Sequence, residues 1–336
     1  MSLASHTPTH RRIALILTTM GLAIATLLGF TGQANAVTIN PVPWTLRTPG
    51  LFEDTNGPSA GRTAFFSPDK DPLGANDWTC KPSAAHPEPV VLIHGTFATA
   101  YGDWNGLSPI LAAQGFCVFA LNYGYTGYRA MNATGDMVAS AGEITAFVKR
   151  VVASTGAKHV ALVGHSQGGA QARYVANLLL PAGLVTKVIA ITATNHQTTL
   201  SGLTNLGDAL GLKDLGFDIL NLIKMPSATQ QAVGSKAPFY TKLNGSGETR
   251  WGIAYTNIAT KYDEVVSPYT QAFITAGLFA SVDNITLQDV CSGDLSEHVS
   301  APYSRNVAQI VLNKLDPGHP HVIKCYPQLP IIGGTR

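Results

Sequence analysis

The sequence predicts a doubly wound α/β domain with a mainly parallel sheet and helices on both faces. Short apolar runs rich in β-branched residues, typical of buried parallel strands, recur along the chain. Segments with helical spacing of apolar residues lie between them, and this alternation favours parallel βαβ units. The chain has 336 residues, of which 45% are hydrophobic and 12% charged, so it can fill one large core.

The first elements follow from residues 89–154. Residues 89–93 form a β-branched apolar run that leads into Gly95, as a buried strand does before a loop. Residues 107–114 read as a helix, and the apolar run at 117–121 predicts a second strand. A helix is expected at about 135–154, because apolar residues recur there at three- and four-residue steps, namely Met137, Ala141, Ile144, Val148 and Val151.

The later elements continue the alternation. The apolar run at 160–163 predicts a buried strand, and residues 167–179 predict the helix that follows it. Further strands are expected at 187–191, 251–256 and 285–289, and a closing helix at 301–315 before a proline-rich tail.

Two segments interrupt this pattern. Residues 37–88 are rich in Pro, Gly, Asp and Asn, which predicts an irregular N-terminal arm with a short strand near 64–66. Residues 195–244 carry leucines separated by Gly and Asp rather than by strand patterns. This second segment either packs as helices on the sheet edge or forms a small cap, or lid, with an apolar inner face. Both interpretations stay open.

The N-terminus has the features of a secretory signal peptide. Arg11 and Arg12 precede an apolar stretch at 13–30, and Ala34-Asn35-Ala36 is a small-x-small cleavage pattern. An uncleaved membrane anchor is the alternative, since the stretch approaches spanning length. We expect residues 1–36 to be removed, leaving a single domain at 37–336 that is soluble and secreted.

Charge and cysteine content narrow the class of protein further. The net charge is +2 without a basic cluster, so nucleic acid is not an expected partner. The four cysteines, Cys80, Cys117, Cys291 and Cys325, contain no C-x-x-C, which argues against a zinc or redox site. In an oxidising compartment they predict two disulfides, for which the sequence alone allows three pairings. No metal or organic cofactor is expected, and we expect a monomer.

The candidate nucleophile lies in the motif Gly164-His165-Ser166-Gln167-Gly168. This is G-x-S-x-G between a predicted strand and a predicted helix, the context of the nucleophile elbow in α/β-hydrolases. The tight turn needs neighbours with almost no side chain, and the two glycines meet that need. We therefore expect Ser166 to be a catalytic nucleophile.

The order of the triad in this fold, Ser then Asp or Glu then His, selects its partners. His298 lies between the last predicted strand and the closing helix, where the base is expected. His196 comes too early in the chain, and His319 and His321 lie in the tail. Without this context, His298 would be interpreted as an ordinary loop histidine.

The acid is expected after the strand at 251–256, where Asp263 lies. Its neighbour Glu264 is expected to point away from the site into solvent. Asp283, Asp289 and Asp294 are alternatives, although most such acids only cap helices or carry surface charge.

The oxyanion hole should combine two backbone N–H groups. One belongs to Gln167, directly after the nucleophile and at a helix N-terminus. The other should come from the loop after the first strand, where Gly95 allows a close turn towards Ser166. We assign it to Thr96, whose hydroxyl can add a third donor, with Phe97 as the alternative. His94 and His165 are expected to tie loops by hydrogen bonds.

These motifs resemble those of secreted bacterial α/β-hydrolases of the lipase class 2 family, and are also similar to the site motifs of fungal lipase B. The matching stretches are Pro89–Thr96, Gly164–Gly169, Asp263–Pro268 and His298. The resemblance implies an α/β-hydrolase fold and the triad and oxyanion roles given above. It also implies the disulfide pairs Cys80–Cys117 and Cys291–Cys325. His165 follows the bacterial pattern and departs from the fungal one, so the fungal acyl pocket is not carried over.

The sequence thus predicts a secreted serine carboxylester hydrolase, a lipase or esterase, that acts on ester or lipid substrates through an acyl-enzyme on Ser166. Transient contact with a lipid interface is expected. The same triad also serves polyester hydrolases, amidases and acyltransferases. A non-catalytic binding module on the same scaffold is the alternative from another class, and retention of a complete triad argues against it.

Overall fold

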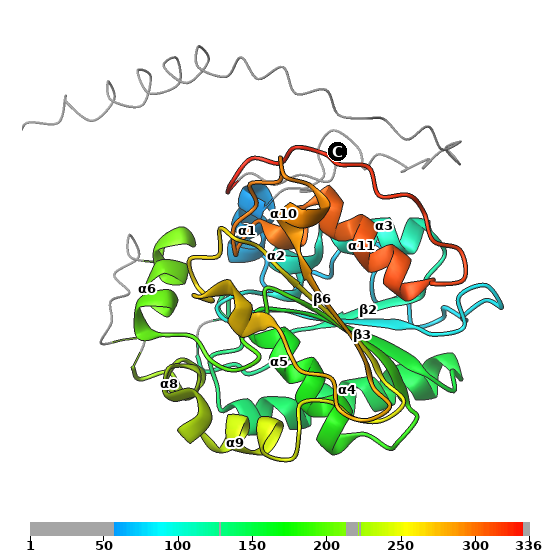
Figure 1. Ribbon diagram of the computed structural model, residues 1–336, viewed down its shortest axis with the longest axis horizontal. Coiled ribbons are helices and arrows are strands. Elements are labelled where there is room, and N and C mark those ends of the chain that lie inside the picture. Colours follow the sequence, from blue (N-terminus) through cyan, green and yellow to red (C-terminus); the bar gives the residue numbers. More distant parts are fainter. Residues whose placement is uncertain (1–56, 128, 213–220, 222, 332–336) are drawn as a thin grey trace, which may run out of the picture. The chain divides into compact units, whose positions relative to one another are not determined.

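The computed structural model describes residues 57–127, 129–212, 221 and 223–331 (Figure 1). The predicted signal peptide and the start of the predicted arm lie outside these residues. Six parallel strands of the described part form one sheet, in the order β2-β1-β3-β4-β5-β6. They are β1 (Val90–Ile93), β2 (Val118–Leu121), β3 (Val160–His165), β4 (Val185–Ile191), β5 (Ala254–Ala259) and β6 (Ser281–Thr286). The predicted parallel sheet is confirmed.

The described helices alternate with these strands. In the first half of the chain they are α1 (Gly57–Phe66), α2 (Ala100–Trp104), α3 (Leu107–Ala113), α4 (Met137–Thr155), α5 (Gln167–Tyr174) and the π-helical turn η1 (Val175–Leu179). In the second half they are α6 (Leu200–Ala209), α8 (Pro226–Val233), η3 (Gly234–Lys236), α9 (Pro238–Gly245), η4 (Tyr269–Ala272), α10 (Leu287–Val290), η5 (Ala301–Tyr303) and α11 (Arg305–Leu315). None of these described helices is both long and apolar enough to cross a bilayer.

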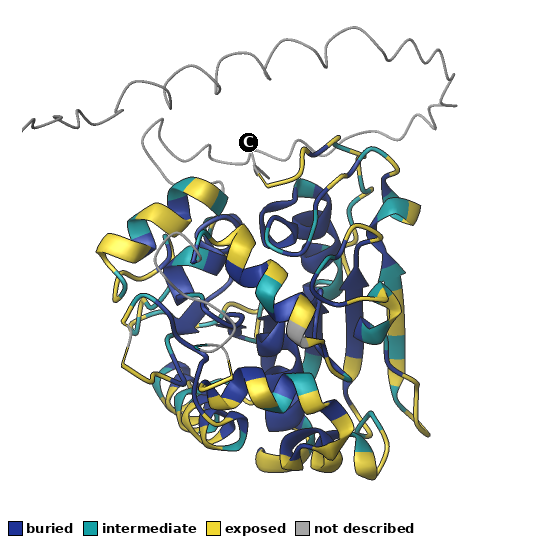
Figure 2. Cartoon of the chain, turned by 90° about the vertical axis from the view of Figure 1, so that its left-hand side faces the viewer, coloured by how far each residue is buried: buried dark blue, intermediate teal, exposed yellow. Residues whose placement is uncertain are grey.

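Two hydrophobic cores lie on opposite faces of the sheet, because successive side chains of a strand point to opposite faces. Val91 and Ile93 of β1 pack in one core with α4, α5 and α9. Val90 and Leu92 pack in the other with α2, α3 and α11. Figure 1 shows these two groups of helices on either side of the sheet, and Figure 2 shows the central strands as buried.

The expected short strand near residues 64–66 is wrong, because this segment is the last turn of α1. Ala60 and Ala64 lie four residues apart on one side of the helix and pack against Tyr101 and Tyr303. The Gly and Pro content of the arm hid this short amphipathic pattern.

The last two strands are displaced from their expected positions. β5 begins at Ala254 rather than at residue 251, because Gly252 has a φ of 82° and Trp251 is 72% exposed. β6 covers Ser281–Thr286 rather than 285–289, and α10 begins at Leu287. β6 is an edge strand in which only Thr286 is buried, so it lacks the apolar run by which the inner strands were recognised.

All strands run in one direction, so their carboxyl ends meet at one edge of the sheet. Loops that leave β1, β3, β5 and β6 at this edge carry every residue predicted for the triad and the oxyanion hole. In open α/β sheets ligands bind outside the carboxyl ends of the strands.

Candidate active site

Ser166 occupies a strained turn between β3 and α5. Its φ of 55° and ψ of −125° are unusual for a residue with a side chain. A Cβ at Gly164 would lie 2.2 Å from the carbonyl oxygen of Gly168, and one at Gly168 would lie 2.0 Å from that of Ile93. Only glycine fits either position, which explains the G-x-S-x-G spacing.

The three residues predicted for the triad lie in hydrogen-bonding contact. Ser166 Oγ is 2.9 Å from His298 Nε2, and His298 Nδ1 is 3.0 and 3.1 Å from the two carboxylate oxygens of Asp263. The backbone N–H groups of Val265 and Val266 donate to Asp263 Oδ1 at 2.9 and 2.7 Å, which fixes the carboxylate towards the imidazole. Ser166 is 2% exposed and His298 fully buried. The arrangement can transfer a proton from the hydroxyl to an imidazole held in one tautomer.

The groups around His298 change the pKa of its imidazole. Burial lowers its pKa, but the charge and hydrogen bond of Asp263, together with the nearby Glu264 and Glu297, raise the pKa above 6.5 overall. The expectation that Glu264 points away from the site into solvent is wrong. Its side chain is half-buried, burial raises its pKa, and a carboxylate oxygen lies 3.4 Å from the His298 backbone nitrogen.

The loop after β1 passes directly beside the nucleophile. A Cβ at Gly95 would lie 2.9 Å from Ser166 Cβ, so only glycine allows this approach. The N–H of Phe97 donates to the carbonyl oxygen of Asn132 at 3.0 Å, which leaves Phe97 unsuited to the oxyanion role. The geometry therefore favours Thr96 over the alternative. Gln167 is the first residue of α5, where helix N–H groups have no intrahelical partner.

A buried chain of hydrogen bonds reaches the Thr96 hydroxyl, and the sequence did not indicate it. Tyr240 donates to Thr194 Oγ1 (3.2 Å), Thr194 donates to Gln231 Oε1 (3.1 Å), and Gln231 Nε2 donates to Thr96 Oγ1 (3.0 Å). The opposite orientation of the Gln231 amide group would point its NH₂ at Thr194 Oγ1, which already accepts from Tyr240. The Thr194 hydroxyl would then no longer have Gln231 Oε1 as its acceptor. Because Thr96 Oγ1 accepts from Gln231, its hydroxyl proton is available as a third donor to an oxyanion.

The described helices of the 195–244 segment pack on the loops that carry the site. The carbonyl oxygen of Glu264 accepts from Asn205 of α6, and a Cβ at Gly202 would lie 2.3 Å from the carbonyl oxygen of Val265. The helices also share an apolar cluster with both loops, which comprises Phe97, Met131, Leu203, Leu206, Leu212, Met225, Ala228 and Val265. Residues 213–220 and 222 of the segment lie outside the described part. Both interpretations of this segment, a cap and packing on the sheet edge, remain open.

Both disulfides are the pairs that the resemblance implies, Cys80–Cys117 and Cys291–Cys325. The second joins the segment before His298 to the C-terminal tail, where the N–H of Leu295 also donates to the carbonyl oxygen of Gln328. The described residues contain no free cysteine and no cluster of side chains suited to a metal ion.

The alternative acids all have partners away from His298. These contacts are Asp283 with Lys314, Asp289 with Lys261, and Asp294 with Ser304 and Asn306.

His196, which comes too early in the chain to be the base, instead contacts Glu248 and the carbonyl oxygen of Gln271. Burial raises the pKa of Glu248, but hydrogen bonds from His196 and from the N–H of Thr275 lower it to about 2 overall. This cluster ties the segment before β5 to the loop before β6.

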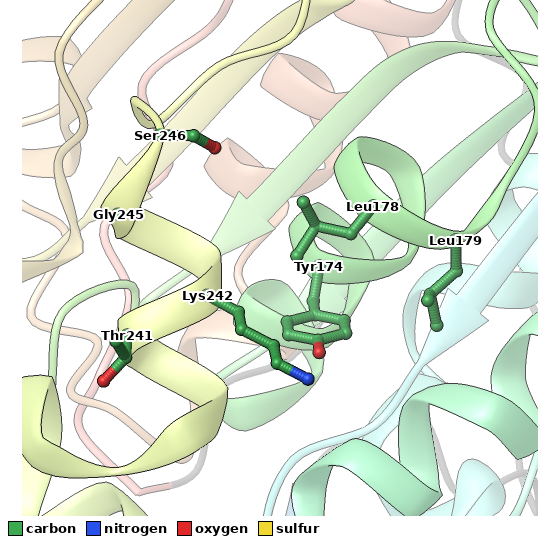
Figure 3. Close-up of a pocket in the computed structure, with 7 residues that line it drawn as sticks. All are labelled: Tyr174, Leu178, Leu179, Thr241, Lys242, Gly245 and Ser246. Carbon is green, nitrogen blue, oxygen red and sulfur yellow. The ribbon is translucent and has the colours of Figure 1, made fainter.

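A separate hollow of about 450 Å³ lies between η1 and α9 (Figure 3). Tyr174, Leu178 and Leu179 supply its apolar wall, and the Lys242 side chain points from α9 towards Tyr174. The remaining lining residues are Thr241, Gly245 and Ser246. Its lining is distinct from the group around Ser166.

Comparisons with known proteins point to one family. A family model described as lipase (class 2) matches residues 87–285. Two proteins named triacylglycerol lipase, from Pseudarthrobacter phenanthrenivorans and Burkholderia plantarii, are each 38% identical over 99 residues. This alignment covers 28% of the chain and 29% and 26% of those proteins, so the chain spans less than a third of either relative.

The crystal structure of Aspergillus fumigatus lipase B superposes with a TM-score of 0.56 at 19% identity, covering 78% of this chain and 58% of that one. At this identity the likeness shows the fold, which is that of the α/β-hydrolases.

Proposed function

Because the chain belongs to the lipase (class 2) family, we propose that it is a serine carboxylester hydrolase of the lipase or esterase type. The observation that carries this proposal is the continuous contact from Ser166 Oγ through the His298 ring to the Asp263 carboxylate. The names of the two bacterial relatives support an acyl ester as substrate, although each alignment covers less than a third of the relative.

The reaction proceeds in two halves on this group. Ser166 Oγ attacks the ester carbonyl while His298 Nε2 takes the hydroxyl proton, and Asp263 stabilises the resulting imidazolium. The N–H groups of Thr96 and Gln167 bind the oxyanion of the tetrahedral intermediate. His298 returns the proton to the departing alcohol and an acyl-enzyme remains. Water activated by His298 then releases the acid.

The apolar cluster that includes Phe97, Leu203 and Val265 gives the site an environment suited to an acyl chain. We propose that α6 and α8 form the cap that supplies this surface. Contact with a lipid interface and a monomeric state stay predictions.

Export is part of the same proposal. Two disulfides are typical of proteins that fold in an oxidising compartment, which supports secretion. The signal peptide at 1–36 stays a prediction.

The test is turnover of p-nitrophenyl esters of increasing chain length, beside a triglyceride emulsion, a polyester film and an anilide. The wild type should hydrolyse esters, and Ser166→Ala should abolish this while keeping the wild-type melting temperature. Ser246→Ala, at an exposed serine outside the site, is the matched control and should keep full activity. Wild-type activity in Ser166→Ala would contradict the proposal, and cleavage of the anilide in preference to esters would replace the ester substrate with an amide.

A further inference from the structure

A second histidine–aspartate pair lies directly behind the candidate triad. His165 precedes Ser166 at the end of β3, and its ring is buried. Its Nδ1 is 2.9 Å from Oδ2 of Asp103, a residue of α2, and its Nε2 is 3.0 Å from the backbone carbonyl oxygen of His298. The ring therefore bridges α2 and the loop that carries the candidate base.

Asp103 extends this bridge to the oxyanion loop. The same Oδ2 that faces His165 accepts the N–H of Gly95 at 2.7 Å, and Gly95 precedes Thr96. A Cβ at Gly95 would lie 3.2 Å from His165 Nδ1 and 2.9 Å from Ser166 Cβ, so the loop, the ring and the nucleophile are in direct contact. The Asp103 carboxylate and the His165 imidazole thus connect the oxyanion loop, the turn that carries the nucleophile and the loop that carries the candidate base.

Both ring nitrogens of His165 have hydrogen-bonding partners. A backbone carbonyl oxygen can only accept, so Nε2 of His165 must carry a hydrogen. The contact between Nδ1 and Asp103 Oδ2 needs a second one. Burial raises the pKa of Asp103, but the charge and hydrogen bond of His165, with contributions from His94 and the Gly95 N–H, lower it overall. The Asp103 carboxylate thus accepts from the Gly95 N–H and faces His165 Nδ1 through the same oxygen.

We propose that His165 and Asp103 are positioning residues of the active site, and that the His165 ring, in contact with Asp103 and with the His298 carbonyl oxygen, holds the His298 loop and the Gly95–Thr96 loop in register with Ser166. The inference rests on the proposed ester hydrolysis. His165 does not itself transfer the proton from Ser166, because both of its ring nitrogens are engaged elsewhere. The other titratable rings near it are His94 and His298, the latter with a ring centroid 5.1 Å away.

Two substitutions of His165 each remove one of its two hydrogen bonds and keep the other. In His165→Asn the amide nitrogen can take the place of Nδ1 and keep the bond to Asp103, while the bond to the His298 carbonyl is lost. In His165→Gln the amide nitrogen can take the place of Nε2 and keep the bond to His298, while the bond to Asp103 is lost. Asp103→Asn removes the carboxylate charge to which the Gly95 N–H donates, so it weakens the hold on the oxyanion loop.

We expect kcat for p-nitrophenyl butyrate to fall about 100-fold in His165→Asn, since displacement of a catalytic group by about 1 Å has this effect. KM should change less than threefold, because the acyl-binding surface is untouched. A purely structural role would instead lower the melting temperature and leave kcat per folded molecule unchanged. His159→Asn, at an exposed histidine, is the matched control and should keep the wild-type kcat.

A measurement on the wild type does not depend on the stability of any variant. In ¹⁵N-histidine NMR, Nε2 of His165 should carry a hydrogen that is protected from solvent exchange, because it donates to the His298 carbonyl oxygen. A His165 Nε2 without a hydrogen, or wild-type kcat in all three variants, would overturn the inference. Absence of ester turnover in the wild type would instead overturn the proposed function, so the two failures are distinguishable.

Discussion

Gly168→Ala tests whether the elbow geometry controls catalysis. The new Cβ would lie 2.0 Å from the carbonyl oxygen of Ile93 and 2.5 Å from that of His94. Carbon and oxygen atoms rarely approach below about 3.3 Å. The start of α5 must therefore move away from the end of β1 by roughly 1 Å. Both of these oxygens belong to the backbone and not to a flexible side chain, so the backbone itself has to move.

That movement separates the two halves of the oxyanion hole. Gln167 moves with α5, whereas Thr96 belongs to the loop after β1. Overpacking of this kind costs about 1–3 kcal/mol of stability, and displacement of a reacting group by about 1 Å costs about 100-fold in rate. We expect both effects in Gly168→Ala, so kcat/KM should fall at least ~100-fold even in the folded fraction.

The assay is kcat/KM for p-nitrophenyl butyrate, with the folded fraction taken from urea unfolding. Gly142→Ala is the matched control, because a Cβ there has no atom within 4 Å in the middle of α4. Alanine should stabilise that helix by about 0.5–1 kcal/mol and leave turnover unchanged. A Gly168→Ala protein with kcat/KM within threefold of the wild type would refute this reasoning.

Three further predictions follow from the contacts of the site and of the cluster around Glu248. Asp263→Asn should lower kcat by about 10⁴-fold, and because Asp263 raises the pKa of His298, the acid limb of the pH–rate profile should move to lower pH. In the wild type that limb should lie above pH 6.5. Gln231→Leu removes the donor to the Thr96 hydroxyl, so stopped-flow or steady-state assays should show kcat reduced about tenfold with KM unchanged. The pKa of Glu248 is lowered to about 2, so its stabilisation is complete above pH 4.5 and is lost as the pH falls towards 2. Thermal unfolding of Glu248→Gln should show a lower melting temperature at pH 7 and a smaller loss between pH 4.5 and 2.

Local patterns were sufficient to locate the inner strands and the nucleophile. β1 and the central parts of β3 and β4, residues 160–163 and 188–191, are continuous apolar runs, because both faces of a central parallel strand are buried. The glycines around Ser166 are required by backbone contacts within one turn, so their spacing is visible in the sequence. The disulfide pairs came from the resemblance, since the residues alone left three pairings open.

Other features depend on contacts between distant segments and have no local signature. β6 is exposed at the sheet edge and reads as a polar segment. Asp103 lies 62 residues before His165, and Gln231 lies 135 residues after Thr96. Neither residue belongs to a motif, and α8 has further polar residues beside Gln231. Only the packing of α2 and α8 beside the strand ends shows that both reach the active site.

The most direct test of the central claim is labelling with a fluorophosphonate probe followed by peptide mass spectrometry. Labelling needs a serine hydroxyl activated by an imidazole, which is the contact observed between Ser166 and His298. We expect one adduct per chain, on Ser166, formed at least ~100-fold more slowly in His298→Ala. Labelling of a different serine, or labelling of Ser166 at an unchanged rate in His298→Ala, would contradict the account.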